Sequence, residues 1–289
     1  MLLAEIKSVL TFAAFSAEPD DSNVSWAKRF EGRKSLLINV SRSQTSWKAV
    51  NKKGRLEDGG VMEGEFSDIA PQRADEWRLM ADGGWCSVSV NNRFIISLEN
   101  NMMRGDNVTG LLRTNARAVL GPKYDRGKRY AMCHHPETTA SMLLACEESM
   151  VKTTEDVLKN IGLRAGRVCC GLFALLEHAV GEIYNIKRGG VPANASIIVA
   201  CEGSIAVLIQ QDDVWKELRS RSGMGPDAVE TSLQIITPLV QKLPQGSPVY
   251  FISDGQDLKF RSELMAHLEK LGAQDMTQDD LLWTILGSR

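Results

Sequence analysis

Two apolar runs separated by a short turn dominate residues 195–215, ASIIVACEGSIAVLIQQDDVW. Apolar runs of this length, bounded by turn residues, are typical of strands in a buried sheet. The segment Glu202-Gly203-Ser204 therefore predicts a tight turn between two core strands. A glycine-containing hairpin can also bind phosphate through its backbone N–H groups, so the same turn is a candidate anion site.

The composition fits a globular protein with room for about two domains in 289 residues. Hydrophobic residues make up 43% and charged residues 24%, which excludes a disordered or fibrous chain. Lys and Arg (34) nearly balance Asp and Glu (36), so no overall charge favours nucleic acid or an anionic membrane. The six cysteines lack CxxC spacing, which favours reduced thiols and a cytoplasmic location.

Residues 1–30 are predicted to form an amphipathic helix and a linker. Apolar residues at 2, 3, 6, 9, 10 and 13 recur at helical spacing, and the segment 16–32 is polar. Glu5 and Lys7 interrupt the apolar run, and neither a basic region nor a cleavage site frames it, so we do not predict a signal peptide. No uninterrupted apolar run approaches the ~20 residues of a membrane span.

Strands and helices alternate along the rest of the chain. In the first half we predict a meander over 34–63, a hairpin over 85–100 with its turn at Asn91-Asn92, a helix over 106–120, strands at 128–136 and 141–149, a helix over 150–163, a strand at 164–170 and a helix over 171–186. In the second half we predict the opening hairpin, a helix over 227–243, a strand at 247–253, a helix over 261–272 and a C-terminal helix. Two halves of similar layout favour an α/β layer architecture.

Metal and common enzyme motifs point to no site. Cys133 and His135 would share one face of a strand, but a closed zinc site needs four ligands and no second cluster is apparent. No GxSxG, HExxH, GxxxxGK[ST] or GxGxxG pattern occurs, so we nominate no catalytic residue and no metal ligand. KYDRGKRY, residues 123–130, is basic with two tyrosines and is the candidate for binding single-stranded nucleic acid, although a solvated loop explains it better.

The second half, ASIIVACEGSIAVLIQQDDVWKELRSRSG followed by a helix and SPVYFISDGQDLKFRSELMAHLEKLG, resembles the superfamily of actin, sugar kinases and Hsp70. Within it the chain is most similar to PilM and the cytoplasmic domain of GspL, assembly proteins of type IV pili and type II secretion. LLINVSRSQTSWKAVNKKGRLEDGG resembles the first phosphate hairpin of that family. The resemblance spans about residues 35–289 and rests on element order.

The resemblance implies an α/β, two-lobed actin-like (ribonuclease H-like) fold with mixed sheets flanked by helices. Its first lobe, with an inserted subdomain, would cover 31–165, and its second lobe 166–289. The nucleotide positions of the family fall on Asn39, Ser41, Thr45, Gly203, Ser204 and Gly255.

The family's nucleotide pattern is altered in this chain. Its two hairpin acids match Asn39 and Cys201, one glycine matches Ser41, and its adenosine GG turn matches Asp254-Gly255. Loss of two acids removes the expected Mg²⁺ ligands, and a Cβ in place of a glycine hydrogen hinders close approach of phosphates. The resemblance therefore implies no hydrolysis and no required cofactor, and it leaves weak ATP or ADP binding open.

These observations leave two classes of function for the chain. The first is a non-catalytic scaffold, peripheral to the inner membrane, which binds the cytoplasmic tail of an inner-membrane pilus or secretion protein, binds no nucleic acid and has a possible homodimeric form. The alternative is an active ATPase or small-molecule kinase of the same superfamily, which would need Mg²⁺ ligands and a general base.

Overall fold

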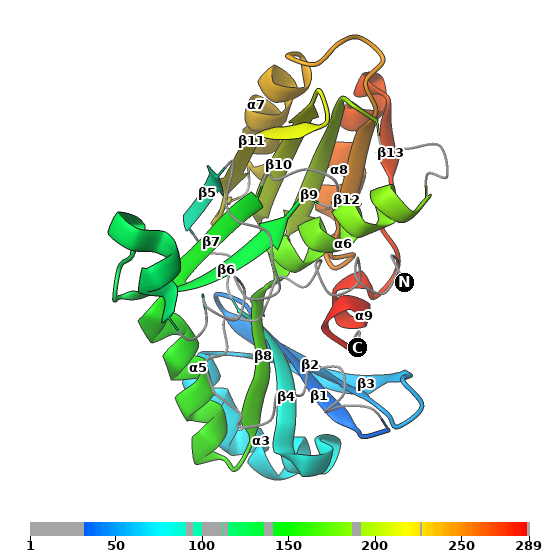
Figure 1. Cartoon of the computed structure of the whole chain (residues 1–289). Helices are drawn as coiled ribbons and strands as arrows, with labels where there is room; N and C mark the ends of the chain where they lie inside the picture. The colour runs from blue at the N-terminus through cyan, green and yellow to red at the C-terminus, as the bar shows by residue number, and fades with distance from the viewer. Residues whose placement is uncertain are drawn as a thin grey trace.

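The computed structural model describes residues 32–90, 95–99, 112, 115–135, 141–186, 192–225 and 227–287. Within them the chain forms two lobes, each built on a five-stranded sheet (Figure 1). The sheets have the equivalent orders β3-β2-β1-β4-β8 and β11-β10-β9-β12-β13. In each sheet the first three strands along the chain pair antiparallel and the other two add in parallel. The predicted two-lobed α/β layout with mixed sheets is confirmed.

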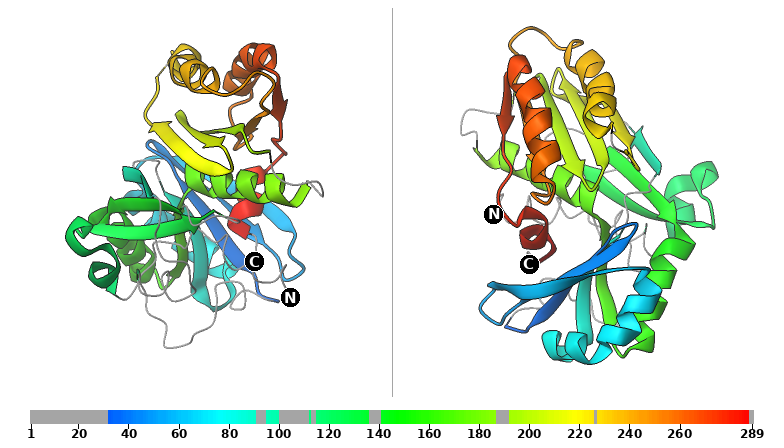
Figure 2. Two further views of the ribbon diagram at one scale, coloured as in Figure 1. Left: turned by 45° about the horizontal axis from the view of Figure 1, so that its top comes forward. Right: turned by 180° about the vertical axis from the view of Figure 1, so that it is seen from behind.

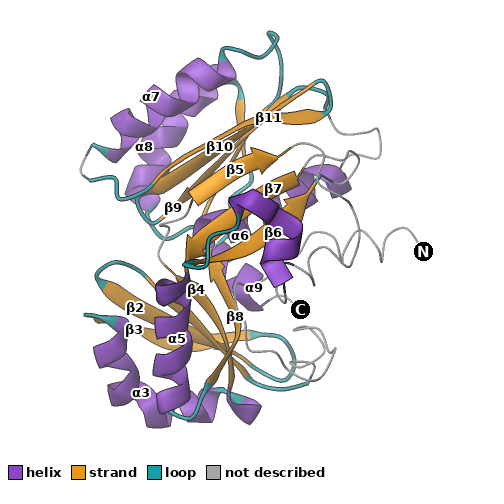
Figure 3. Cartoon of the chain, turned by 60° about the vertical axis from the view of Figure 1, so that its left-hand side comes forward, coloured by secondary structure: helices purple, strands orange, loops and turns teal. Residues whose placement is uncertain are grey.

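The first lobe contains β1 (Ser35–Val40), β2 (Gln44–Val50), β3 (Leu56–Glu63), α3 (Phe66–Met80), η1 (Asp82–Gly84), β4 (Trp85–Val90), α5 (Glu148–Asn160) and β8 (Arg164–Cys170). The predicted meander over 34–63 is confirmed by β1, β2 and β3. Helices α3 and α5 lie on one face of the sheet (Figure 3). The predicted boundary between residues 165 and 166 falls inside β8, which belongs as a whole to the first sheet.

Strand alternation explains which side chains of β1 face which neighbour. Ile38 pairs with Trp47, and the indole of Trp47 contacts Trp77 of α3. Leu37 lies on the opposite face, where a Cβ built on Gly287 would be 3.3 Å from its Cδ1. Because successive side chains alternate, Asn39 shares the Leu37 face, away from α3.

The second lobe contains β9 (Ala195–Cys201), β10 (Ser204–Gln211), β11 (Val214–Arg221), α7 (Ala228–Val240), β12 (Val249–Ser253), α8 (Leu258–Leu268), η3 (Glu269–Leu271) and β13 (Ala273–Asp275). The predicted hairpin, strand and two helices are confirmed here. One face of its sheet, with Ile198, Val207 and Phe251, packs on α7 and α8 to form a separate apolar core.

A third sheet, of order β5-β7-β6, comes from the chain between β4 and α5. Its strands are β5 (Ile95–Glu99), β6 (Lys128–His134) and β7 (Ser141–Glu147), and η2 (Gly121–Lys123) precedes β6. The predicted hairpin over 85–100 is wrong, because β4 lies between β1 and β8 whereas β5 pairs with β7. Side chains 86–90 are all buried, as expected of a central strand covered on both faces.

Helices α6 (Gly171–Ile186) and α9 (Leu281–Gly287) connect the lobes. Helix α6 follows β8 and packs mainly on β9, while α9 packs on α6, β1 and β4. Figures 1 and 2 show α9 between the two five-stranded sheets. A single apolar core therefore runs from the first lobe through both helices to the inner face of the second sheet.

Some predicted elements lie outside the described residues. The N-terminal helix and linker of residues 1–30 do so entirely, and of the helix over 106–120 only 112 and 115–120 are described, all of them helical. Among the helices that the structure describes, none combines the length and apolarity needed to cross a membrane.

Candidate functional site

The second hairpin is a two-residue turn, as predicted. Cys201 pairs with Ser204, and the turn residues Glu202 and Gly203 have φ angles of 45° and 63°. Positive φ at both positions is typical of a type I′ turn, which suits glycine and is uncommon for glutamate. The carbonyl of Gly203 accepts a hydrogen bond from the Met224 amide at 2.8 Å, and a Cβ on Gly203 would lie 3.1 Å from the Met224 carbonyl oxygen. Glycine is therefore required here both for its φ angle and for close packing.

The first hairpin closes on itself. The Ser41 amide donates to the Gln44 carbonyl at 3.0 Å, and the Ser41 hydroxyl donates to the same oxygen. Thr45 is fully buried, and its hydroxyl has no hydrogen-bond partner in the described part of the chain. These two hydroxyls, predicted to face a phosphate, take no part in the contact between the hairpins that is described below.

The turn after β12 supplies a buried carboxylate. Gly255 has a φ of 75°, which favours glycine, and Asp254 before it is 4% exposed. Asp254 accepts the backbone N–H of Glu202 on Oδ2 at 3.1 Å and that of Gln256 on Oδ1 at 3.0 Å. The carboxylate of Asp254 thus already accepts a hydrogen bond from a backbone N–H of the second hairpin.

A side-chain hydrogen bond joins the two hairpins across the lobes. Asn39 Nδ2, at the end of β1, donates to Glu202 Oε1 at 2.5 Å. The structure therefore brings together Asn39, Glu202 and Asp254, with Gly203, Ser204 and Gly255 adjacent to them in the chain.

Glu202 was predicted as a turn residue, but its side chain is not among the predicted site residues. Strand alternation would point its side chain away from Cys201, but the positive φ of the turn ends that alternation. The available signal was a glutamate in a turn position where asparagine, aspartate or glycine is preferred.

The surroundings of the Glu202 and Asp254 carboxyl groups disfavour their charged forms. Burial, followed by the nearby Asp254 carboxylate, raises the pKa of Glu202 to about 7, against the lowering effect of the Asn39 hydrogen bond. Burial also raises the pKa of Asp254, although hydrogen bonds from Gln256, Glu202 and Cys201 lower it. These surroundings therefore favour the neutral form of the two carboxyl groups over the anionic form.

This arrangement is a poor receptor for phosphate. A phosphate at the second hairpin would compete with Asp254 for the Glu202 amide and would lie close to two carboxyl groups. Across the described ranges, no three His, Cys, Asp or Glu side chains gather in a way that could hold a metal ion.

His135 lies in an apolar junction between lobes. It is fully buried, its Nε2 is 2.7 Å from the hydroxyl of Tyr184, and its ring contacts that of Trp215. The hydroxyl of Tyr184 also donates to Gln210 at 3.1 Å. The side chain of Cys133 lies outside what is described, so these contacts bear on His135 alone, and they are those of a core histidine.

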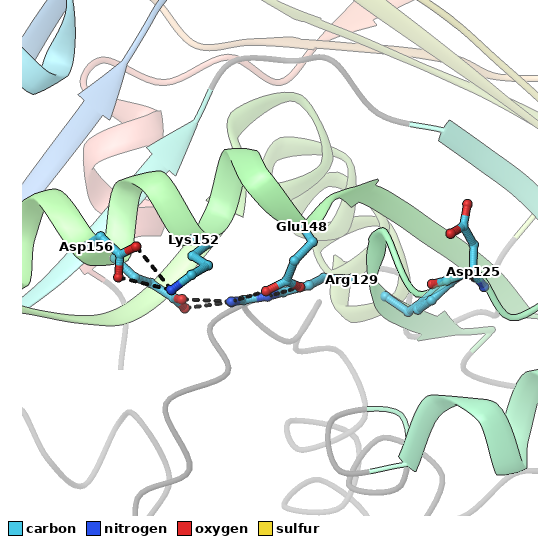
Figure 4. A network of polar contacts seen from close by, with 7 residues as sticks. Asp125, Arg129, Glu148, Lys152 and Asp156 are labelled. Carbon is cyan, nitrogen blue, oxygen red and sulfur yellow. Dashed lines mark hydrogen bonds and ion pairs between the residues drawn. The ribbon is translucent and has the colours of Figure 1, made fainter.

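The basic stretch 123–130 contributes Arg129 to an ion-pair network (Figure 4). Arg129 binds Glu148 and Glu155 through pairs of hydrogen bonds of 2.6–2.8 Å, and its side chain is 11% exposed. Lys128 pairs with Asp125 at 3.4 Å. This network attaches β6 to α5 and leaves Arg129 unavailable to nucleic-acid phosphates.

The chain matches no family model and no curated protein, but it is similar to several solved structures. One is a Bacteroides thetaiotaomicron protein of unknown function with an actin-like ATPase fold, which has 12% identity and a TM-score of 0.54 over 92% of this chain and 100% of that one. Another is a PilM–PilN type IV pilus biogenesis complex, with 13% identity and a TM-score of 0.55 over 87% and 89%. The cytoplasmic domain of EpsL, an inner-membrane component of the Vibrio cholerae type II secretion system, has 10% identity and a TM-score of 0.48 over 88% and 92%. The similarity to the first two of these structures concerns the fold, and it confirms the predicted actin-like fold.

Proposed function

We propose that this chain is a non-catalytic actin-like scaffold of a bacterial pilus or secretion machine. In this role it binds the cytoplasmic tail of an inner-membrane partner and is peripheral to the membrane only through that partner. The structural similarity to the PilM–PilN complex, a complex of pilus biogenesis proteins, supports the class of machine. Recognition of a tail would rely on main-chain pairing or on apolar anchors in a groove, as is common for extended segments.

The observation that carries the non-catalytic part of the proposal is the set of hydrogen bonds between the two hairpins and the turn after β12. Asn39 is hydrogen bonded to Glu202, and Asp254 accepts a backbone N–H on each of its oxygens. Phosphoryl transfer would need Mg²⁺ acids facing the phosphates and a base near the acceptor hydroxyl. Asn39 and Cys201 stand where the related family has those acids, so the active ATPase or kinase is the weaker alternative.

Calorimetry with Mg-ATP tests the absence of a nucleotide function. We expect no saturable heat at ligand concentrations up to about 1 mM, a range that covers most functional sites. A parallel assay of phosphate release should give the background rate. Saturable sub-millimolar binding, or Mg²⁺-dependent release by the folded protein, would contradict the proposal.

Binding of synthetic tail peptides tests the scaffold itself. The peptides carry the cytoplasmic tails of the inner-membrane assembly proteins encoded in the same genome, and scrambled peptides of equal charge serve as controls. We expect one tail to raise fluorescence anisotropy with a Kd of about 1 µM, while its scrambled form does not. Equal responses to native and scrambled tails, or no response to any tail, would contradict the proposal.

A further inference from the structure

Strand β3 forms an outer edge of the first sheet. Among the described strands it pairs only with β2, regularly over residues 60–63 and with a bulge at residues 58 and 59 (Figure 1). Across the described chain, no hydrogen bond reaches the backbone of residues 56–63 from any element other than β2. The sequence of β3, LEDGGVME, also lacks the lysine and proline residues that commonly protect such an edge. Its outer backbone groups can therefore pair with an added strand.

One face of β3 carries an exposed apolar residue between acidic residues. Val61 and Glu63 lie on the face opposite to that of Trp47, and therefore away from α3. Val61 is 62% exposed, and Asp58 and Glu63 are exposed as well. Neither carboxylate has an ion-pair partner among the described residues. We call Asp58, Val61 and Glu63 the acidic edge.

An open hollow adjoins the acidic edge. It has a volume of about 360 Å³, and its lining includes Asp58 and Val61 of β3, Lys48 of β2, Gln256 of the second lobe and Trp283 of α9. The ammonium group of Lys48 is already paired with Asp280 at 2.8 Å. The hollow can therefore hold an apolar side chain against Val61, while the carboxylate of Asp58 remains open to a cation.

The charge of the acidic edge discriminates between the segments that could pair with it. A second copy of β3 would bring carboxylates of the two chains together, which disfavours pairing. Residues 1–31 of this chain contain more acidic than basic residues, so they are no better matched. A segment rich in lysine and arginine gains attraction from Asp58 and Glu63. Cytoplasmic segments next to membrane spans have this composition, because they carry an excess of Lys and Arg.

We infer that the acidic edge is the docking site for a basic, extended segment, which adds to the first sheet as a further strand beside β3. On the face of the acidic edge, the segment presents an apolar side chain to Val61 and basic side chains to Asp58 and Glu63. Because side chains of a strand alternate, these residues occupy every second position of the segment. The assignment of the segment to the cytoplasmic tail of an inner-membrane partner rests on the proposed function.

A designed strand tests the docking site without knowledge of the natural partner. The probe is the fluorescein-labelled peptide GKTKTVTKTK, in which lysines and one valine occupy every second position. Its control, GKPKTVTKPK, has the same charge, but its two prolines lack the N–H groups needed for strand pairing. In fluorescence anisotropy at low salt, we expect a Kd of about 100 µM for the probe and binding about tenfold weaker for the control.

Charge reversal on β3 tests where the probe binds. Asp58→Lys combined with Glu63→Lys should weaken binding of the probe by about tenfold or more. Glu230→Lys combined with Glu269→Lys makes the same change of net charge at exposed positions of the second lobe and should leave the Kd unchanged. Binding of the probe should also slow hydrogen exchange of the backbone amides of residues 56–63.

The outcomes distinguish the docking site from the proposed function. A probe that does not bind the parent, or a probe or tail that binds the parent and the β3 charge-reversal variant equally, would overturn the docking site, whereas any tail that binds leaves the scaffold function standing. Slow exchange of residues 56–63 in the free protein would also overturn the docking site, since the edge would then already be paired. If the probe binds at β3 but no tail binds, the docking site stands and the proposed function fails.

Discussion

Replacing Glu202 with glutamine should make the protein more stable at alkaline pH. Glutamine has nearly the same shape and keeps an oxygen that can accept the Asn39 hydrogen bond, but it carries no charge. The folded protein raises the pKa of Glu202 from 4.5 to about 7, chiefly through burial. A carboxyl with a raised pKa holds its proton more tightly when folded than when unfolded, so its ionisation opposes folding.

The sign and size of the effect follow from this shift. Below about pH 4.5 both states carry the proton, and Glu202 has no pH-dependent effect on the free energy of unfolding. Between about pH 4.5 and 7 the unfolded chain loses the proton first, and the free energy of unfolding falls as pH rises. At about 1.4 kcal/mol per pH unit, the full loss above pH 7 is about 3 kcal/mol. Glu202→Gln should recover about this amount at pH 9 and none at pH 4.5.

Urea unfolding followed by tryptophan fluorescence, repeated across this pH range, measures the difference between parent and variant. Glu217→Gln is the matched control, because hydrogen bonds from Lys242 and Arg219 lower the pKa of Glu217. Loss of the Glu217 carboxylate should slightly lower the free energy of unfolding at neutral pH and leave it unchanged at acid pH. The effect is opposite in sign to the one expected for Glu202→Gln. Parallel pH profiles for the parent and Glu202→Gln would refute the reasoning, as would a gain confined to acid pH.

Three further substitutions probe contacts elsewhere. Arg129→Ala removes the ion-pair partner of the buried Glu155 and should lower the free energy of unfolding by about 3 kcal/mol in urea titrations. Lys48→Ala removes a partly exposed ion pair with Asp280 and should lower it by less than about 1 kcal/mol. Gly171→Val forces Cys201 and its neighbours apart and should lower the free energy of unfolding by about 2 kcal/mol, seen as a lower Tm in calorimetry. An unchanged Tm for Gly171→Val would show that the lobes are not closely packed there.

The regular apolar segments made much of the fold predictable. The runs that form β9 and β10, with a turn at Gly203, and the buried α6 are strong local signals that tertiary packing reinforces. Helix α3 is not among the predicted elements although Phe66, Ile69 and Trp77 have helical spacing; Pro71 lies inside it, and a proline weakens a helical pattern. The pairing of β4 could not be predicted, since a short run does not reveal its partner strand.

The site was predictable only in part. The altered positions Asn39 and Cys201 are visible in sequence, but the contact between Asn39 and Glu202 joins residues that only the fold brings together. The same holds for Asp254, whose carboxylate was expected near an anionic ligand and instead accepts the amide of the second hairpin. Such contacts depend on the angle between the lobes, and a local pattern carries no information on that angle.

Helix α9 packs on the first sheet but is synthesised after both sheets. The ribosome makes residues 281–287 after every strand of both sheets, yet their side chains cover the Leu37 face of β1. Until this helix emerges, the nascent chain keeps an apolar surface uncovered. The first lobe is made early but completed late, and an apolar surface exposed in that interval favours aggregation of the nascent chain.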